Sequence, residues 1–185
     1  MAQKPAWIQG DHVVDFREAY AGDPESYPLP IPTDVGADER YNGQIAARSQ
    51  YLQLDDQGKV LFFIVDGRIY DRKGYLIADN VDDVDCSECV RKGISGVAVL
   101  QVPGSCTRYY VFTTAENSST LPYLAWASVL DLEAPNPHFS GDSNKKGRLL
   151  SYTELDLAGF DLPFDWYSTS FGGSRDVLFA LNDED

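Results

Sequence analysis

The chain has 185 residues, of which 43% are hydrophobic and 12% aromatic, a composition typical of a globular domain with a sizeable core. Its 15 basic and 29 acidic residues give a net charge of −14, so its surface potential repels nucleic acid, and we expect no nucleic-acid partner. Its apolar runs are far shorter than the roughly 18 residues of a membrane-spanning helix, so we expect no membrane span.

The first 42 residues are predicted to hold an N-terminal strand and a connector. Residues 6–16 favour a short strand or two that bury Trp7, Val14 and Phe16. Four prolines then lie between positions 24 and 32. Because proline lacks a backbone donor, this stretch disfavours both helix and interior strand. We therefore predict an extended connector.

Residues 43–80 predict a first four-stranded unit, with strands at 44–54, 60–65, 68–70 and 75–77. The run 60–65 is apolar throughout, so both of its faces are expected to be covered. Asp66 and Gly67 follow it directly and form a strong signal for a two-residue hairpin turn. This segment should therefore form one meandering antiparallel sheet.

Residues 93–157 repeat this plan, with strands predicted at 96–102, 107–114, 123–132 and 148–157. The strand 107–114 has apolar residues on both faces and should be central in its sheet. The composition of 133–146 is that of a loop. Residues 158–185, with a strand at 176–181, begin a further unit or add a C-terminal strand.

Four-stranded meanders that repeat every 40 to 50 residues or so are typical of propeller blades. We therefore predict an all-β fold in a single domain, residues 1–185, built from antiparallel four-stranded meanders. The fold would be either an incomplete propeller or a compact two-sheet unit.

The cysteines favour a structural role. Cys86, Cys89 and Cys106 lack the further ligands of a zinc site, and the acidic residues around the first two would raise a thiol pKa. We expect a disulfide between Cys89 and Cys106, with Cys86 to Cys106 as the alternative, or three inert thiols.

An acidic stretch offers a weak candidate for a calcium site, because hard cations bind several carboxylate and carbonyl oxygens. Its residues are Asp79, Asp82, Asp83 and Asp85. Their spacing does not match an EF-hand loop, and a solvated loop is the alternative. A weaker candidate is the loop with Asn136, Asp142 and Asn144. No other cofactor is expected.

Aromatic residues predicted to lie in loops are the better candidates for binding, because large amphipathic rings commonly make protein or glycan contacts. They are Tyr20, Tyr27, Tyr41, Trp166 and Tyr167, for each of which core packing is the alternative. The two histidines, His12 and His138, have no nucleophile motif nearby. We therefore expect no catalytic residues.

Several segments together resemble the N-terminal blades of secreted β-propeller-like surface proteins of Bacteroidetes-type bacteria. They are WIQG at 7–10, VDF at 14–16, YLQLDDQGKVLFFIVDGRIYDRKG at 51–74, VLQVPGSCTRYYVFT at 99–113, AWASVLDL at 125–132 and GRL at 147–149. The resemblance covers roughly residues 7–150. It implies a secreted or cell-surface protein, with a cysteine in the turn where Cys106 stands, and it transfers no catalytic residue.

The expected function is a non-catalytic extracellular or cell-surface interaction module, part of an adhesin or surface assembly, that binds protein or glycan. No signal peptide is visible at the start, so we expect that a leader has been removed. A propeller needs at least about four blades. An open sheet edge would therefore meet the remaining domains of a larger protein or a neighbouring subunit. The alternatives are a hydrolase propeller fragment acting on polysaccharide or peptide, and a structural subunit of an oligomer or filament.

Overall fold

The computed structural model describes residues 6–15, 25–47, 49–79, 96–116, 123–155, 164–169 and 177–182. Within these ranges the chain is all-β, with antiparallel strand pairs throughout. Its helical segments there are two short 3-10 turns, η1 (Ala37–Glu39) and η2 (Pro137–Phe139). None of the described sheets closes into a barrel. The predicted all-β fold of antiparallel meanders is confirmed.

The described residues form three sheets and one hairpin in chain order, and in each of them consecutive strands are neighbours. Sheet 1 consists of β1 (Ala6–Gln9), β2 (His12–Asp15) and β3 (Glu25–Pro28). Sheet 2 consists of β4 (Gln50–Leu54), β5 (Val60–Val65), β6 (Arg68–Asp71) and β7 (Leu76–Asp79). Sheet 3 consists of β8 (Gly96–Gln101), β9 (Arg108–Glu116), β10 (Tyr123–Pro135) and β11 (Lys146–Leu155). The hairpin pairs β12 (Phe164–Thr169) with β13 (Val177–Asn182).

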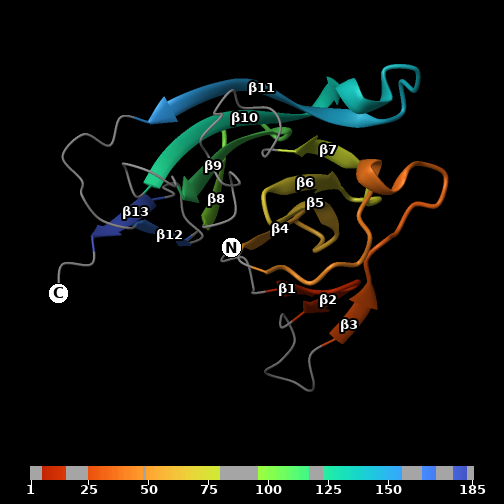
Figure 1. The fold of residues 1–185 in the computed structure, drawn as a ribbon, viewed down its shortest axis with the longest axis horizontal. Helices are drawn as coiled ribbons and strands as arrows, with labels where there is room; N and C mark the ends of the chain where they lie inside the picture. Colours follow the sequence, from red (N-terminus) through yellow and green to blue (C-terminus); the bar gives the residue numbers. More distant parts are fainter. Residues whose placement is uncertain are drawn as a thin grey trace.

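The sheets are arranged like the blades of a fan (Figure 1). The first strand of each sheet lies beside the first strand of the next, so that β1 contacts β4, β4 contacts β8, and β8 contacts β12. At the outer side, β7 of sheet 2 packs against β11 of sheet 3. The meanders are therefore stacked face to face, with their first strands inside, as in propeller blades.

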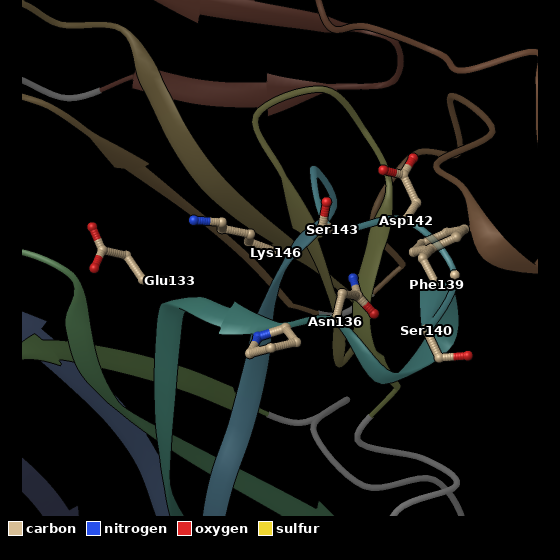
Figure 2. Close-up of a pocket in the computed structure, with 9 residues that line it drawn as sticks. Glu133, Asn136, Phe139, Ser140, Asp142, Ser143 and Lys146 are labelled. Carbon is tan, nitrogen blue, oxygen red and sulfur yellow. The ribbon is translucent and has the colours of Figure 1, made fainter.

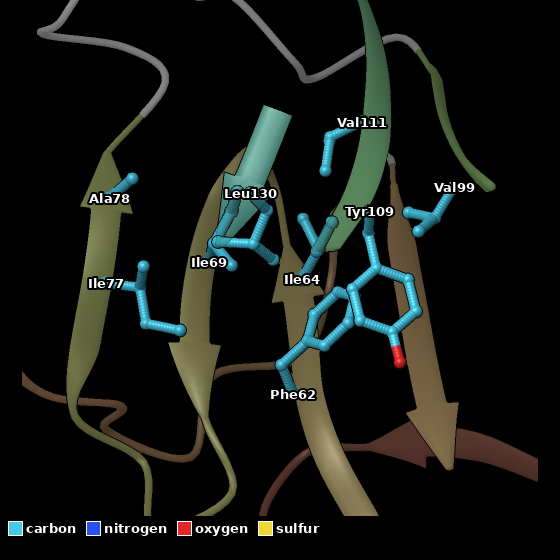
Figure 3. Close-up of a cluster of buried hydrophobic side chains, with 9 residues drawn as sticks. All are labelled: Phe62, Ile64, Ile69, Ile77, Ala78, Val99, Tyr109, Val111 and Leu130. Atoms are coloured by element: carbon cyan, nitrogen blue, oxygen red, sulfur yellow. The ribbon is translucent and has the colours of Figure 1, made fainter. Parts of the chain in front are cut away.

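Sheet 2 is the central layer, and its two faces bury different side chains. The face toward sheet 3 belongs to a cluster (Figure 3) formed by Phe62, Ile64, Ile69, Ile77, Ala78, Val99, Tyr109, Val111 and Leu130. The face toward sheet 1 belongs to a second cluster, formed by Ile8, Val13, Leu29, Tyr41, Phe63, Val65, Tyr70 and Leu76. Successive residues of β5 alternate between the clusters because strand side chains point to opposite faces. The prediction that both faces of residues 60–65 are covered is confirmed.

The turn between β5 and β6 has the predicted two-residue form. Asp66 has a φ of 47° and Gly67 a φ of 84°, the positive values that a type I′ hairpin requires. The Asp66 carboxylate also accepts hydrogen bonds from the backbone N–H groups of Ala47 (2.8 Å) and Ser49 (3.2 Å). One turn residue therefore both reverses the chain and fixes the segment that enters β4.

Most predicted strands differ from the observed ones by a few residues at their ends, and two segments before sheet 2 differ more. Part of the proline-rich connector forms β3, because Pro28 is the last residue of an edge strand, where a missing N–H costs no ladder hydrogen bond. The strand predicted at 44–54 begins only at Gln50. Gly43, with a φ of 82°, interrupts extended backbone before it.

The predicted burial of Trp7 is wrong. In sheet 1, Trp7 pairs with Val14 and Ile8 pairs with Val13. The register directs Ile8 and Val13 toward sheet 2, so Trp7 lies on the opposite face and is 61% exposed. Alternation alone does not reveal which face meets the core, because a shift of one residue exchanges the faces.

Candidate functional site

A cavity of about 280 Å³ lies in the connection between β10 and β11, at residues 133–146 (Figure 2). Its lining consists of Glu133, Pro135, Asn136, Phe139, Ser140, Gly141, Asp142, Ser143 and Lys146. Residues from the end of β10, from η2 and from the start of β11 thus meet around one space. We treat this cavity, called the 133–146 pocket below, as the candidate site.

The floor of the pocket is fixed by Asn136, a buried polar residue. Its Nδ2 donates to the carbonyl oxygen of Leu76 in β7 at 2.8 Å. Its Oδ1 accepts from the backbone N–H of His138 at 2.9 Å and so caps η2. Because both ends of the amide are hydrogen-bonded, Asn136 ties the connection to sheet 2.

The far wall of the pocket is a hydrogen-bonded turn that begins at Asp142. The N–H of Asp142 donates to the carbonyl of Phe139 (2.8 Å), and the N–H of Lys145 donates to the carbonyl of Asp142 (3.1 Å). The Asp142 carboxylate accepts from the N–H of Asn144 at 3.0 Å. These local bonds hold the wall in one conformation without a ligand.

The pocket combines charges of both signs with uncharged groups. Glu133 and Asp142 supply carboxylates, and Lys146 supplies an ammonium group. Figure 2 shows Glu133 and Lys146 on one side and Phe139 and Asp142 on the other. Two serine hydroxyls, Pro135 and the Phe139 ring complete a lining that combines polar and apolar surfaces.

Beside the pocket, Lys145 joins three segments of the chain. Its Nζ lies 4.1 Å from the ring centroid of Tyr75 and 4.4 Å from that of Phe139. The two rings meet edge to face, with centroids 5.7 Å apart. The Lys145 Nζ also lies 3.5 Å from a carboxylate oxygen of Asp34. Cation–π and ionic contacts together therefore hold the loop 133–146 against sheet 2 and the connector.

The contact between Asp34 and Tyr75 shifts the pKa of both groups. The Tyr75 hydroxyl donates to Asp34 at 2.9 Å, and this hydrogen bond lowers the pKa of the Asp34 carboxyl. The hydrogen bond to Asp34 in turn raises the pKa of the Tyr75 phenol. The carboxylate stays ionised and the phenol protonated at neutral pH, which preserves the anion that faces Lys145.

The hydrogen bonds of the pocket serines and of the two histidines bear on the chemistry of the pocket. In the part of the chain that the structure describes, no hydrogen bond joins a pocket serine to a histidine or carboxylate base. The backbone N–H of His138 donates to Asn136, whereas the other histidine, His12, begins β2, with its Nδ1 2.7 Å from a carboxylate oxygen of Asp11. Hydrogen-bonding groups around one aromatic ring can hold a polar ligand without transforming it.

The predicted calcium ligands are only partly described. Asp79 ends β7 as a buried residue, and its carboxylate accepts from Nε of Arg68 at 2.8 Å. Asp82, Asp83 and Asp85 lie outside the described residues, so this site stays a prediction. Within the described ranges, no group of three or more His, Cys, Asp or Glu side chains is placed to hold a metal ion.

The weaker calcium candidate, the loop with Asn136, Asp142 and Asn144, stays a prediction. Its residues Asn136 and Asp142 do lie together in one loop. However, the Asn136 oxygen accepts from His138, and one Asp142 oxygen accepts from Asn144. These oxygens therefore stabilise the loop itself.

Cys106 is exposed in the turn between β8 and β9 and forms no disulfide with a described residue. Its predicted partner Cys89 and the alternative Cys86 lie outside the described residues. The disulfide therefore stays a prediction.

Tyr41 was predicted to be an exposed binding residue, and this is wrong. It lies in a loop but is fully buried. Its ring packs edge to face on Phe63 and Tyr70, with centroids 5.1 and 5.3 Å away. Tyr41 therefore joins the core between sheets 1 and 2.

The other predicted aromatics are distributed differently. Tyr27 lies in β3 and packs partly buried against the second cluster. Trp166 and Tyr167 lie in strand β12 rather than in a loop, paired with Ala180 and Phe179 of β13. Tyr20 lies outside the described residues.

The pocket residues Glu133, Phe139 and Lys146 were missed by the sequence reasoning. The composition of 133–146 indicates only a loop, and the lining arises when the two ends of that loop meet. The sole local signal was the group of Asn and Asp residues in the loop.

No protein-family model matches the chain, and neither the curated proteins nor the solved structures contain a significant match to it. Among the described residues, no helix has the length and apolar character needed to cross a membrane.

Proposed function

We propose that this protein is a non-catalytic, extracellular or cell-surface β-propeller-like interaction module, part of an adhesin or surface assembly that binds protein or glycan. The 133–146 pocket carries this proposal. It is lined by charged, polar and apolar groups, among them one aromatic ring, and hydrogen bonds within the chain hold its walls. Preorganised sites of this kind bind without a large ordering cost.

The scaffold supports the proposal because it presents the pocket rigidly. Two apolar clusters cover both faces of sheet 2, and the loop that forms the pocket is tied to that sheet through Asn136 and Lys145. Binding residues are often found on loops that a rigid framework positions. A cell-surface location remains part of the proposal and rests on the sequence resemblance.

The proposal is tested by presenting the purified chain to an array of immobilised glycans and to isolated cell-surface proteins, followed by titration of each hit in solution. We expect reversible, saturable binding with the ligand recovered unchanged. Any glycan hit is then incubated with the chain and assayed for new reducing ends, and any protein hit for new termini. Catalytic release of either product would overturn the non-catalytic assignment in favour of a hydrolase.

An oligomeric structural subunit is a second candidate, because β11 offers a ten-residue edge strand in the described sheet order β11-β10-β9-β8. Unpaired strand edges can add a strand from another chain. Light scattering over a range of protein concentrations tests this candidate. A dimer or filament would favour it, and a monomer at all concentrations would count against it.

A further inference from the structure

We propose that the 133–146 pocket binds a single uncharged sugar ring of a glycan. This inference rests on the proposed function, since it names the ligand class of the same site. It follows from the charge balance, the size and the rigidity of the pocket.

The charge balance disfavours anionic ligands, and Lys146 offsets part of the attraction for cations. An anion that approaches Lys146 also meets the carboxylates of Glu133 and Asp142, within the field of a chain of net charge −14. A cation that approaches the carboxylates meets Lys146. A neutral ligand with several hydroxyl groups can donate to the carboxylates and accept from the ammonium group at no such cost.

The size limits the ligand to one ring. A cavity of about 280 Å³ is slightly smaller than the roughly 300–1,000 Å³ of pockets that enclose drug-sized molecules. One pyranose ring fits this space, and the remainder of a glycan chain would extend into solvent. Because the contact area is so small, we expect a dissociation constant on the order of 1 mM for a monosaccharide.

The aromatic wall supplies the apolar contact that sugar C–H groups require. Phe139 lines the pocket, its ring meets the Tyr75 ring edge to face, and the Lys145 ammonium group lies over it, 4.4 Å from the ring centroid. Because these contacts fix the ring before any ligand arrives, binding does not have to order it. The buried amide of Asn136 fixes the adjacent floor in the same way.

The test uses the methyl glycosides of glucose, galactose, mannose and N-acetylglucosamine, with binding measured by saturation-transfer NMR on the full chain. The pocket variant is Glu133→Ala with Lys146→Ala. Both side chains are exposed, and neither makes a hydrogen bond or ion pair with a described residue. The control variant is Asp56→Ala with Lys73→Ala, two exposed turn residues that lie outside the pocket and give the same change of charge.

We expect at least one glycoside to bind the wild type and the control equally, and the pocket variant to bind it about tenfold more weakly or not at all. Equal binding to the pocket variant would overturn the inference and leave the proposed function standing, because the glycan would then bind elsewhere. Failure of all four glycosides to bind the wild type at millimolar concentrations would also overturn it. The array experiment described above would then decide the proposed function independently.

Discussion

Tyr41→Phe removes one oxygen atom from the core between sheets 1 and 2 and should destabilise the fold measurably. The Tyr41 hydroxyl lies within hydrogen-bonding distance of the carbonyl oxygens of Gly10 and Gln44, the latter at 2.8 Å. Phenylalanine keeps the ring contacts but leaves these acceptors without their donor. A lost hydrogen bond together with an unsatisfied buried carbonyl costs about 1–3 kcal/mol. For a chain of this length, a loss of about 2 kcal/mol lowers Tm by about 4–8 °C.

The same hydroxyl predicts how stability depends on alkaline pH. Burial, with smaller contributions from Tyr70 and Asp11, raises the pKa of Tyr41 from its ordinary value of 10.0 to about 12. Since the folded-state pKa lies above the unfolded one, the contribution to stability is fully present below about pH 10. It is lost as the pH rises toward 12. Tyr41→Phe removes this part of the alkaline loss.

Urea unfolding monitored by the fluorescence of the buried Trp126 measures the effect, with Tyr110→Phe as the control. Tyr110 is 37% exposed, and its hydroxyl makes no hydrogen bond to a described residue, so its variant should change the free energy of unfolding by less than about 0.5 kcal/mol. If Tyr41→Phe unfolds like the control at neutral pH, the hydroxyl does not join the two sheets and the reasoning fails.

Three further variants test other parts of the structure by urea unfolding. Gly74 has a φ of 86°, and an alanine Cβ there would overlap the Pro30 carbonyl. Gly104 has a similar φ of 78° but open space around it, so Gly74→Ala should lower the free energy of unfolding by at least about 2 kcal/mol more than Gly104→Ala does. Equal losses in the two variants would contradict the clash. Thr113 is fully buried, and its hydroxyl has no hydrogen-bond partner among the described residues. Thr113→Val should therefore be neutral or stabilising by up to about 1 kcal/mol, and a clear loss would refute this. Lys145→Met should cost about 1 kcal/mol through its lost cation–π and ionic contacts, and an unchanged midpoint would show that this contact group contributes nothing.

Local sequence patterns were sufficient to predict features that depend on backbone preferences and on the alternation of neighbouring side chains. Asp66 and Gly67 tolerate positive φ, so a two-residue hairpin was predictable, and it fixes the register of β5 against β6. The apolar run 60–65 required cover on both faces, which sheets 1 and 3 provide. These features follow from backbone preferences and alternation within a few residues.

Long-range packing decided the features that were missed. Tyr41 follows a proline-rich stretch and precedes Gly43, which indicates a loop but not that the loop inserts its ring between two sheets. Trp166 and Tyr167 lie in a strand whose partner begins only at Val177. No pattern within the single segment shows that pairing.

The pocket also depends on long-range packing. Variants that disturb this packing should therefore behave differently from variants of the exposed pocket residues. The bond from Asn136 to Leu76 connects residues 60 positions apart, and the one from Tyr75 to Asp34 connects residues 41 positions apart. The pocket is therefore formed only when sheets 2 and 3 and the connector are packed together. Variants in these contacts should change stability and binding together, whereas exchanges at the exposed Glu133 and Lys146 should change binding alone. This contrast distinguishes a ligand site from a loop that serves only to close the sheet.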